Sequence, residues 1–88
     1  MEKFMSKYAC GKEIEDQSKI LLSLYEQRDV LLKTAVFIKK LDCTENGEKV
    51  RKQLMVICKT RITRINNKIT ETNDRIYRLQ QQEAVAPE

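Results

Sequence analysis

Mostly apolar residues recur at alternating intervals of three and four along the second half of the chain. These positions are Met55, Cys58, Ile62, Ile65, Ile69, Thr72, Ile76 and Leu79. The residues between them are almost all polar or charged in the C-terminal part, where only Tyr77 interrupts the polar outer face. Such a repeat places one narrow apolar seam along a helix, as in a coiled coil. The pattern predicts a helix over about residues 48–82.

The first half of the chain carries a seam with the same spacing. Its members are Ile14, Gln17, Leu21, Leu24, Arg28, Leu31, Ala35 and Ile38. We expect the polar members Gln17 and Arg28 to set the register at some cost in stability. Arg28 can also lay its aliphatic stem along the seam and keep its charged head in water. Because no Gly or Pro interrupts residues 12–41, we predict a helix over about residues 12–42.

The dipeptide Asn46-Gly47 separates the two helical segments. Asn-Gly is a strong helix breaker, which predicts a loop at about residues 43–47. Thr44 or Asn46 can cap the helix that follows, since both side chains accept a hydrogen bond from a backbone amide. The long flanking segments lack the alternation of a β-hairpin, so the loop joins two helices.

A chain that folds back at this loop brings its two seams face to face. In the antiparallel register that results, Leu24 lies opposite Ile69, and Asp42 can form an ion pair with Arg51. The predicted fold is therefore all-α, an antiparallel two-helix hairpin over residues 12–82, completed to a larger bundle by a partner or a second copy. Residues 1–11 are expected to form an N-terminal arm, or a first helical turn interrupted by Gly11, and residues 83–88 a disordered tail.

The composition agrees with long helices and excludes several chemistries. The chain of 88 residues has two Gly, one Pro and 34% charged residues, which leaves few turn formers for a β fold. It has no His, so a Ser-His-Asp triad or a His-ligated metal is impossible. Glycine-rich phosphate-binding motifs are absent. A two-helix rod offers no concave pocket, so we expect no enzyme, cofactor or small-molecule substrate.

Cysteine spacing and hydropathy bear on location. No apolar stretch reaches the ~18 residues of a membrane-spanning helix, and the first ten residues lack the apolar core of a secretory signal. Cys10, Cys43 and Cys58 are widely spaced and odd in number, which favours reduced thiols in the cytoplasm or nucleus. We interpret them as small packing residues, although Cys43 in the predicted loop could form an intermolecular disulfide.

The first helical segment and the loop-proximal part of the second hold more apolar residues than one seam requires. Those assigned to partner binding are Leu22, Tyr25, Val30, Leu32, Val36, Phe37, Leu41, Leu54 and Ile57. Such an apolar surface must be buried against another element, and residues 1–11 and 80–88 hold too few apolar side chains to bury it. We therefore expect a partner, either a second copy or a different chain, with Tyr25 and Phe37 as anchors. The predicted function is a non-catalytic protein–protein interaction module: a small subunit, adaptor or chaperone that binds by helix packing.

A basic ridge follows the second helical segment and gives the alternative function. It consists of Arg61, Arg64, Lys68, Arg75 and Arg78, in a chain with a net charge of +4. Such a ridge can bind nucleic acid, as in a small regulator, or it can be the solvated flank of a long charged helix. Apart from Tyr77, stacking aromatics are absent from this segment, and so are known nucleic-acid-binding motifs, so the solvated flank is favoured.

Overall fold

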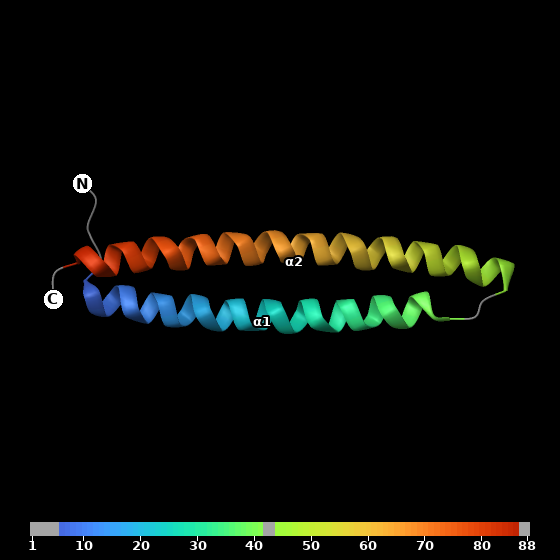
Figure 1. Cartoon of the computed structure of the whole chain (residues 1–88), viewed down its shortest axis with the longest axis horizontal. Coiled ribbons are helices and arrows are strands. Elements are labelled where there is room, and N and C mark those ends of the chain that lie inside the picture. The colour runs from blue at the N-terminus through green and yellow to red at the C-terminus, as the bar shows by residue number, and fades with distance from the viewer. Residues whose placement is uncertain (1–5, 42–43, 87–88) are drawn as a thin grey trace.

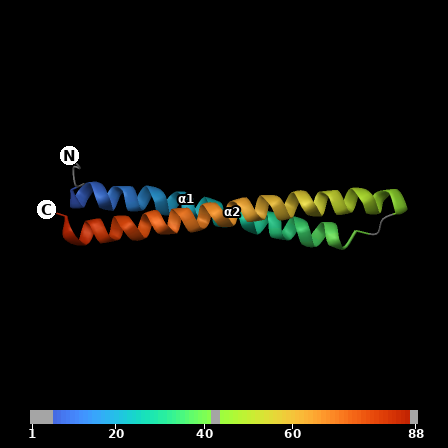
Figure 2. The same ribbon diagram turned by 90° about the horizontal axis from the view of Figure 1, so that it is seen from above.

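The computed structural model describes residues 6–41 and 44–86, which form two antiparallel helices lying side by side (Figure 1). Helix α1 spans Lys7–Lys39 and helix α2 spans Glu45–Val85. The molecule is a rod of 65 × 22 × 12 Å, and the two helices cross gently along its length (Figure 2). The described residues contain no strand, and the predicted all-α helical hairpin is confirmed.

Helix α1 begins earlier than the sequence pattern predicts. The hydroxyl of Ser6 accepts a hydrogen bond from the amide of Ala9 at 3.1 Å and caps the helix. Residues 7–11 are therefore helical, and Gly11 does not interrupt them. Cys10 in this turn is fully buried, and a Cβ on Gly11 would lie 3.2 Å from a carboxylate oxygen of Glu83. Of the two predicted alternatives, the first helical turn is therefore confirmed for residues 7–11 and the arm is wrong there, while residues 1–5 lie outside the described part.

The predicted loop over 43–47 is wrong for residues 45–47, which are helical, whereas Thr44, one of the two predicted caps, is confirmed. The hydroxyl of Thr44 accepts a hydrogen bond from the amide of Gly47 at 3.3 Å, so Thr44 is the cap and Asn46-Gly47 lies within the first turn of α2. Of the predicted loop 43–47, only Thr44 is described outside a helix. Glu45 and Glu48 in the first turn interact favourably with the helix dipole, and these local terms offset the cost of ~1 kcal/mol for a helical glycine.

The other helix ends also shift. The first helix ends at Lys39 rather than near residue 42, and the second continues to Val85, so residues 83–85 are helical instead of a disordered tail. Because α1 ends early, the first turns of α2 extend beyond it at the loop end (Figure 1). Arg51 bridges this step, since its guanidinium donates to the carbonyl of Lys39 at 3.1 Å and pairs with Glu48. The predicted partner of Arg51, Asp42, lies outside the described residues.

The two predicted seams form the interface between the helices. Every predicted seam position on both helices is buried or half-buried. The centre of this interface is a cluster of Leu24, Ile65 and Ile69, with Leu21 and Leu31 packed against it. The cluster joins Leu24 to Ile69, as the predicted register requires. The seam, and not the position of the turn, therefore sets the register.

Polar members of the seam find local partners. The hydroxyl of Thr72, 3% exposed, donates to the carbonyl of Lys68 at 2.7 Å. The amide nitrogen of Gln17 donates to a carboxylate oxygen of Glu13 at 3.0 Å. The buried Oε1 of Gln17, however, has no hydrogen-bond partner among the described residues. Gln17 therefore weakens the seam at this level, because a buried acceptor without a partner costs free energy.

Candidate protein-binding surfaces

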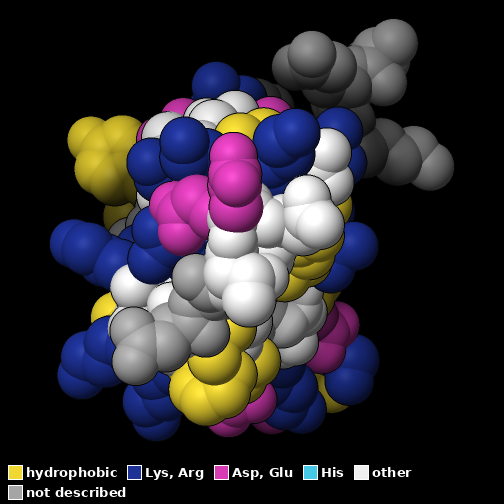
Figure 3. All heavy atoms as spheres, turned by 90° about the vertical axis from the view of Figure 1, so that its right-hand side faces the viewer, with side chains coloured by type: hydrophobic (Ala, Val, Ile, Leu, Met, Phe, Trp, Pro, Cys, Tyr) yellow, Lys and Arg dark blue, Asp and Glu magenta, His cyan; other side chains and the backbone are white. Residues whose placement is uncertain are grey.

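The hairpin leaves all nine residues predicted to bind a partner on its surface. Their exposed fractions run from 38% for Tyr25 and Leu41 to 66% for Phe37. Ile20, Val50 and Val56 add to the exposed apolar side chains. Seen from the loop end, hydrophobic side chains lie between projecting Lys and Arg side chains on several sides of the rod (Figure 3). The seam alone is covered, as expected of two helices without further elements.

These exposed side chains divide between the two flanks of the seam. One surface, the Tyr25 face, consists of Leu22, Tyr25, Leu32 and Val36. The other, the Phe37 face, consists of Val30, Phe37, Leu41, Leu54 and Ile57. Helical spacing of three and four groups each set, and the seam separates the two sets on α1. The rod thus presents two apolar faces that point in different directions.

The Tyr25 face is fixed by contacts around Arg28. The guanidinium of Arg28 lies 4.9 Å from the centre of the Tyr25 ring, which is a cation–π contact. The same guanidinium donates to the side-chain oxygen of Asn66 on α2 at 3.1 Å. Arg28 therefore holds its head at the edge of the seam, as its long stem allows. The contact orders the Tyr25 ring and leaves part of it exposed.

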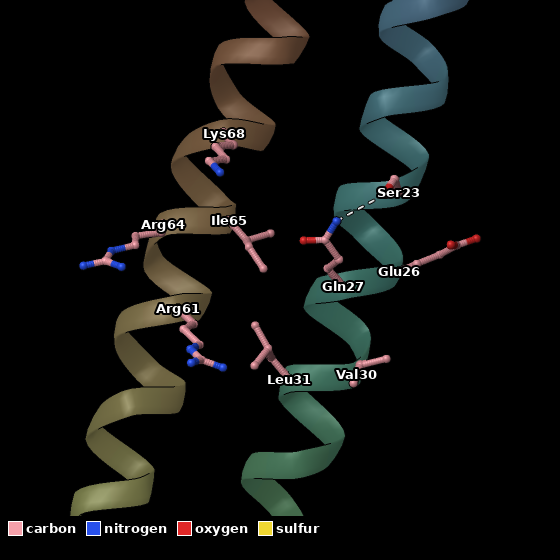
Figure 4. Close-up of a pocket in the computed structure, with 9 residues that line it drawn as sticks. All are labelled: Ser23, Glu26, Gln27, Val30, Leu31, Arg61, Arg64, Ile65 and Lys68. Carbon is pink, nitrogen blue, oxygen red and sulfur yellow. Dashed lines mark hydrogen bonds between the residues drawn. The ribbon is translucent and has the colours of Figure 1, made fainter.

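A groove between the two helices lies beside the Phe37 face. We call it the central groove; it is lined by Ser23, Glu26, Gln27, Val30, Leu31, Arg61, Arg64, Ile65 and Lys68. Leu31 and Ile65 point into the space between the helices and form its floor (Figure 4). Glu26 extends away from the groove on the far side of α1, so it does not approach the ridge (Figure 4). The groove combines an apolar floor with the cations Arg61 and Lys68 at its α2 side, and Arg64 extends outward on the far side of α2 (Figure 4).

The structure divides the basic ridge in two. Arg61, Arg64 and Lys68 line the central groove, whereas Arg75 and Arg78 line a second groove that also contains Glu13. The ion pairs found among the described residues are Lys19–Glu15, Lys33–Asp29 and Arg51–Glu48. None of them involves a ridge residue. In the described part of the chain, the three central cations therefore have no carboxylate within ion-pair distance.

The remaining candidate chemistry is sparse. Cys58 and Cys10 are buried as packing residues, which agrees with the interpretation of their spacing, and Cys43 lies outside the described residues. Within residues 6–41 and 44–86 no cluster of three or more Cys, Asp or Glu side chains could hold a metal ion. Over the same ranges, neither helix has a stretch long and apolar enough to cross a membrane.

Comparison with known proteins gives no match. Neither a family model, nor a curated protein, nor a solved structure is significantly similar to this chain. The function of the chain is therefore inferred from its two apolar faces and its central groove.

Proposed function

We propose that this chain is a non-catalytic protein-binding module, a small subunit, adaptor or chaperone of a larger assembly. It binds by helix packing through the Tyr25 face and the Phe37 face. The observation that supports this function is the exposure of large apolar side chains on both flanks of a hairpin whose two helices can cover only one seam. A third or fourth helix from a partner completes such a hairpin to a bundle with a full core.

The size of the exposed surface fits this proposal. The rod exposes 7230 Å² with a mass of 10.4 kDa. A compact monomer of that mass exposes about 5,400 Å². The surplus is roughly twice the ~800 Å² that one partner buries in a standard interface. The radius of gyration, 19.5 Å, likewise exceeds the ~12 Å of a compact chain of this length.

The composition of the faces adds to the argument from area. A long rod can expose a large area and still be polar, as solvated coiled-coil flanks are. Here the exposed positions include Phe37 at 66%, Leu22 at 60% and Val30 at 62%. Helical spacing groups these side chains on two flanks of the rod, and groups of large exposed apolar side chains mark interaction sites in stable proteins. The aromatic rings of Tyr25 and Phe37 are the expected anchors, because aromatic residues dominate interface energy.

A photo-crosslinking amino acid placed at Phe37 or Tyr25 tests the proposal in the cells that make this protein. We expect protein adducts from both positions, whether the partner is a second copy or another chain. Tyr77 is the matched control, since it is an aromatic residue of α2 with 63% exposure that belongs to neither face. Adducts that form equally at Tyr77, or a monomer without adducts at Phe37 and Tyr25, would contradict the proposal.

A second experiment measures how much Phe37 contributes to the free energy of association. If the purified chain self-associates, sedimentation equilibrium of Phe37→Ala should show association weakened by about 2–4 kcal/mol, the usual cost of truncating a central aromatic anchor. The same measurement on Tyr77→Ala should show association unchanged within about 0.5 kcal/mol, as for surface substitutions. Equal effects of the two substitutions would remove Phe37 from the interface.

A further inference from the structure

The α2 stripe beside the central groove changes chemistry along its length. Leu54 and Ile57 begin it near the loop, and Arg61, Arg64 and Lys68 continue it at spacings of three and four. These five residues therefore share one side of the helix. From Lys49 to Thr70, α2 contains no acidic residue. The stripe is thus apolar near the loop and uniformly cationic at the middle of the rod.

From this stripe and the groove beside it, we propose that the central groove binds an acidic amphipathic helix of another protein. The apolar side of that helix packs on Val30 and Leu31 above Ile65, which is only 9% exposed, and its carboxylates pair with Arg61 and Lys68 and with Arg64 at the outer edge. This inference rests on the proposed function and names the kind of partner that one of its faces takes. A groove between two antiparallel helices whose axes are only slightly inclined to each other accepts a third helix along its length. The stripe from Leu54 to Lys68 spans about 21 Å, or four helical turns of the partner.

Charge complementarity identifies the partner as acidic. The three cations lie within a few turns of one helix, and no carboxylate of the described residues lies within ion-pair distance of them. Glu26, the one acidic residue that lines the groove, points away from them (Figure 4). Like charges on one flank repel each other, and acidic side chains of a bound helix relieve that repulsion.

The apolar floor identifies the partner as a protein. Leu31 and Ile65 lie between the helices at the base of the groove, with Val30 on its rim. A nucleic-acid backbone has no apolar surface to cover such a floor, and the groove lining offers no aromatic ring for base stacking. An acidic amphipathic helix covers the apolar floor with one side and pairs its carboxylates with the cations.

The described ends of the chain lie too far from the groove for a segment of five residues to reach it. Five residues span at most about 18 Å when fully extended. The distance along α1 from Ser6 to Leu31 is roughly 37 Å at the rise of a helix. The end of α2 at Val85 lies at the same end of the rod as the start of α1 (Figure 1).

A second copy is also a poor occupant of this groove. Two copies that meet through this face would bring their Arg61, Arg64 and Lys68 together, and like charges at an interface are unfavourable. A copy that offered a different face would leave its own groove open for the next copy, which leads to a ring or an open chain of subunits. A different protein with an acidic helix avoids both consequences.

Selection from a displayed library of helical peptides tests this inference on the intact hairpin. The library fixes leucine at the seam positions of about four helical turns and randomises the flanking positions among Asp, Asn and Lys. We expect enrichment of Asp at the flanks facing the cations. Binding of a selected peptide should fall about tenfold in the variant with Arg61→Gln, Arg64→Gln and Lys68→Gln, because three exposed ion pairs are lost.

The matched control is the double variant Arg75→Gln and Arg78→Gln, which removes ridge cations outside the central groove. It should bind the selected peptide within about twofold of the unaltered chain. Circular dichroism establishes that each variant remains helical. Selection without acidic enrichment, or binding unaffected by the triple variant, would overturn the inference.

A titration with oligonucleotides tests whether nucleic acid, rather than an acidic helix, occupies the groove. Single-stranded and duplex DNA are titrated against the hairpin at low and high salt, where binding through phosphates weakens steeply. Displacement of the selected peptide by DNA at near-physiological salt, with DNA bound more tightly than any peptide, would assign the groove to nucleic acid. Crosslinking from Tyr25 does not depend on these cations, so the proposed function can stand when the acidic-helix inference fails.

Discussion

Replacing Gly47 with alanine distinguishes the two possible positions for the start of the second helix. In the structure Gly47 lies in the first turn of α2, where its amide donates to the hydroxyl of Thr44. No glycine of the described residues has a positive φ. In a helix, alanine is favoured over glycine by as much as ~1 kcal/mol. We therefore expect Gly47→Ala to stabilise the hairpin by about 0.5–1 kcal/mol.

The alternative gives the opposite sign. If Asn46-Gly47 formed a tight turn, glycine would take a positive φ that alanine adopts only with strain. Gly47→Ala would then destabilise the chain by about 1 kcal/mol or more. The sign of the change therefore reports the backbone conformation at this residue, independently of any partner.

Thermal and urea denaturation followed by circular dichroism measure the effect at one fixed protein concentration. An increase in stability of 0.5–1 kcal/mol corresponds to a Tm higher by about 2–8 °C for a domain of this size. Gly11→Ala is the matched control, because Gly11 lies inside α1 and its added Cβ meets only the flexible carboxylate of Glu83 at 3.2 Å. A lower Tm for Gly47→Ala together with a higher Tm for Gly11→Ala would refute the helix start at Glu45.

Two further substitutions test the seam. Gln17→Leu removes the buried oxygen that lacks a partner and adds an apolar side chain, so urea denaturation should show the hairpin stabilised by about 1–2 kcal/mol; a loss of stability would mean that Gln17 is satisfied in solution. Ile69→Ala removes a side chain that is 6% exposed at the centre of the core cluster, and we expect a cost of about 2–4 kcal/mol. The same truncation at exposed Val56 should change stability by less than about 0.5 kcal/mol, and equal costs at Ile69 and Val56 would place the seam elsewhere.

The seam could be predicted from sequence because packing, not local preference, determines it. Alternating intervals of three and four keep one side of each helix facing the other over the whole rod. Leu24 and Ile69 satisfy this spacing and meet in the core cluster. The polar members Gln17 and Arg28 keep their seam positions because the apolar residues around them hold the register.

The helix ends could not be predicted in the same way, because single local contacts decide them. Asn46-Gly47 is the strongest breaker in the sequence, yet the Thr44 cap two residues earlier captures the amide of Gly47 and starts the helix there. Ser6 acts similarly at the start of α1. A cap of this kind contributes about 1 kcal/mol, which is as large as the penalty for the glycine. Because the cap at Thr44 and the penalty at Gly47 are of equal size, the sequence alone does not show at which residue α2 begins.

The candidate surfaces could be predicted only in part. The surplus of apolar residues follows from counting positions outside the seam, and Phe37 is exposed as that count requires. The division of the basic ridge does not follow from sequence, because Arg61 and Arg75 occupy equivalent positions in the repeat. The two arginines line grooves with different residues from α1. Val30 and Leu31 line the groove of Arg61, whereas Glu13 and Gln17 line the groove of Arg75.

The thin seam links the stability of this fold to its proposed function. The buried side chains are few, and the seam includes the polar residues Gln17 and Thr72. A partner that binds only the folded hairpin adds RT ln(1 + [L]/Kd), about 2.7 kcal/mol at a hundredfold excess over Kd. That gain is as large as the loss expected from Ile69→Ala. Such a partner would therefore restore the fold of a core-damaged chain, whereas, with Phe37 as its proposed anchor, it would not bind a chain that lacks Phe37. Melting measured with and without the partner therefore distinguishes the two kinds of substitution. We expect the partner to restore the Tm of a core variant such as Ile69→Ala but not that of a variant that lacks Phe37.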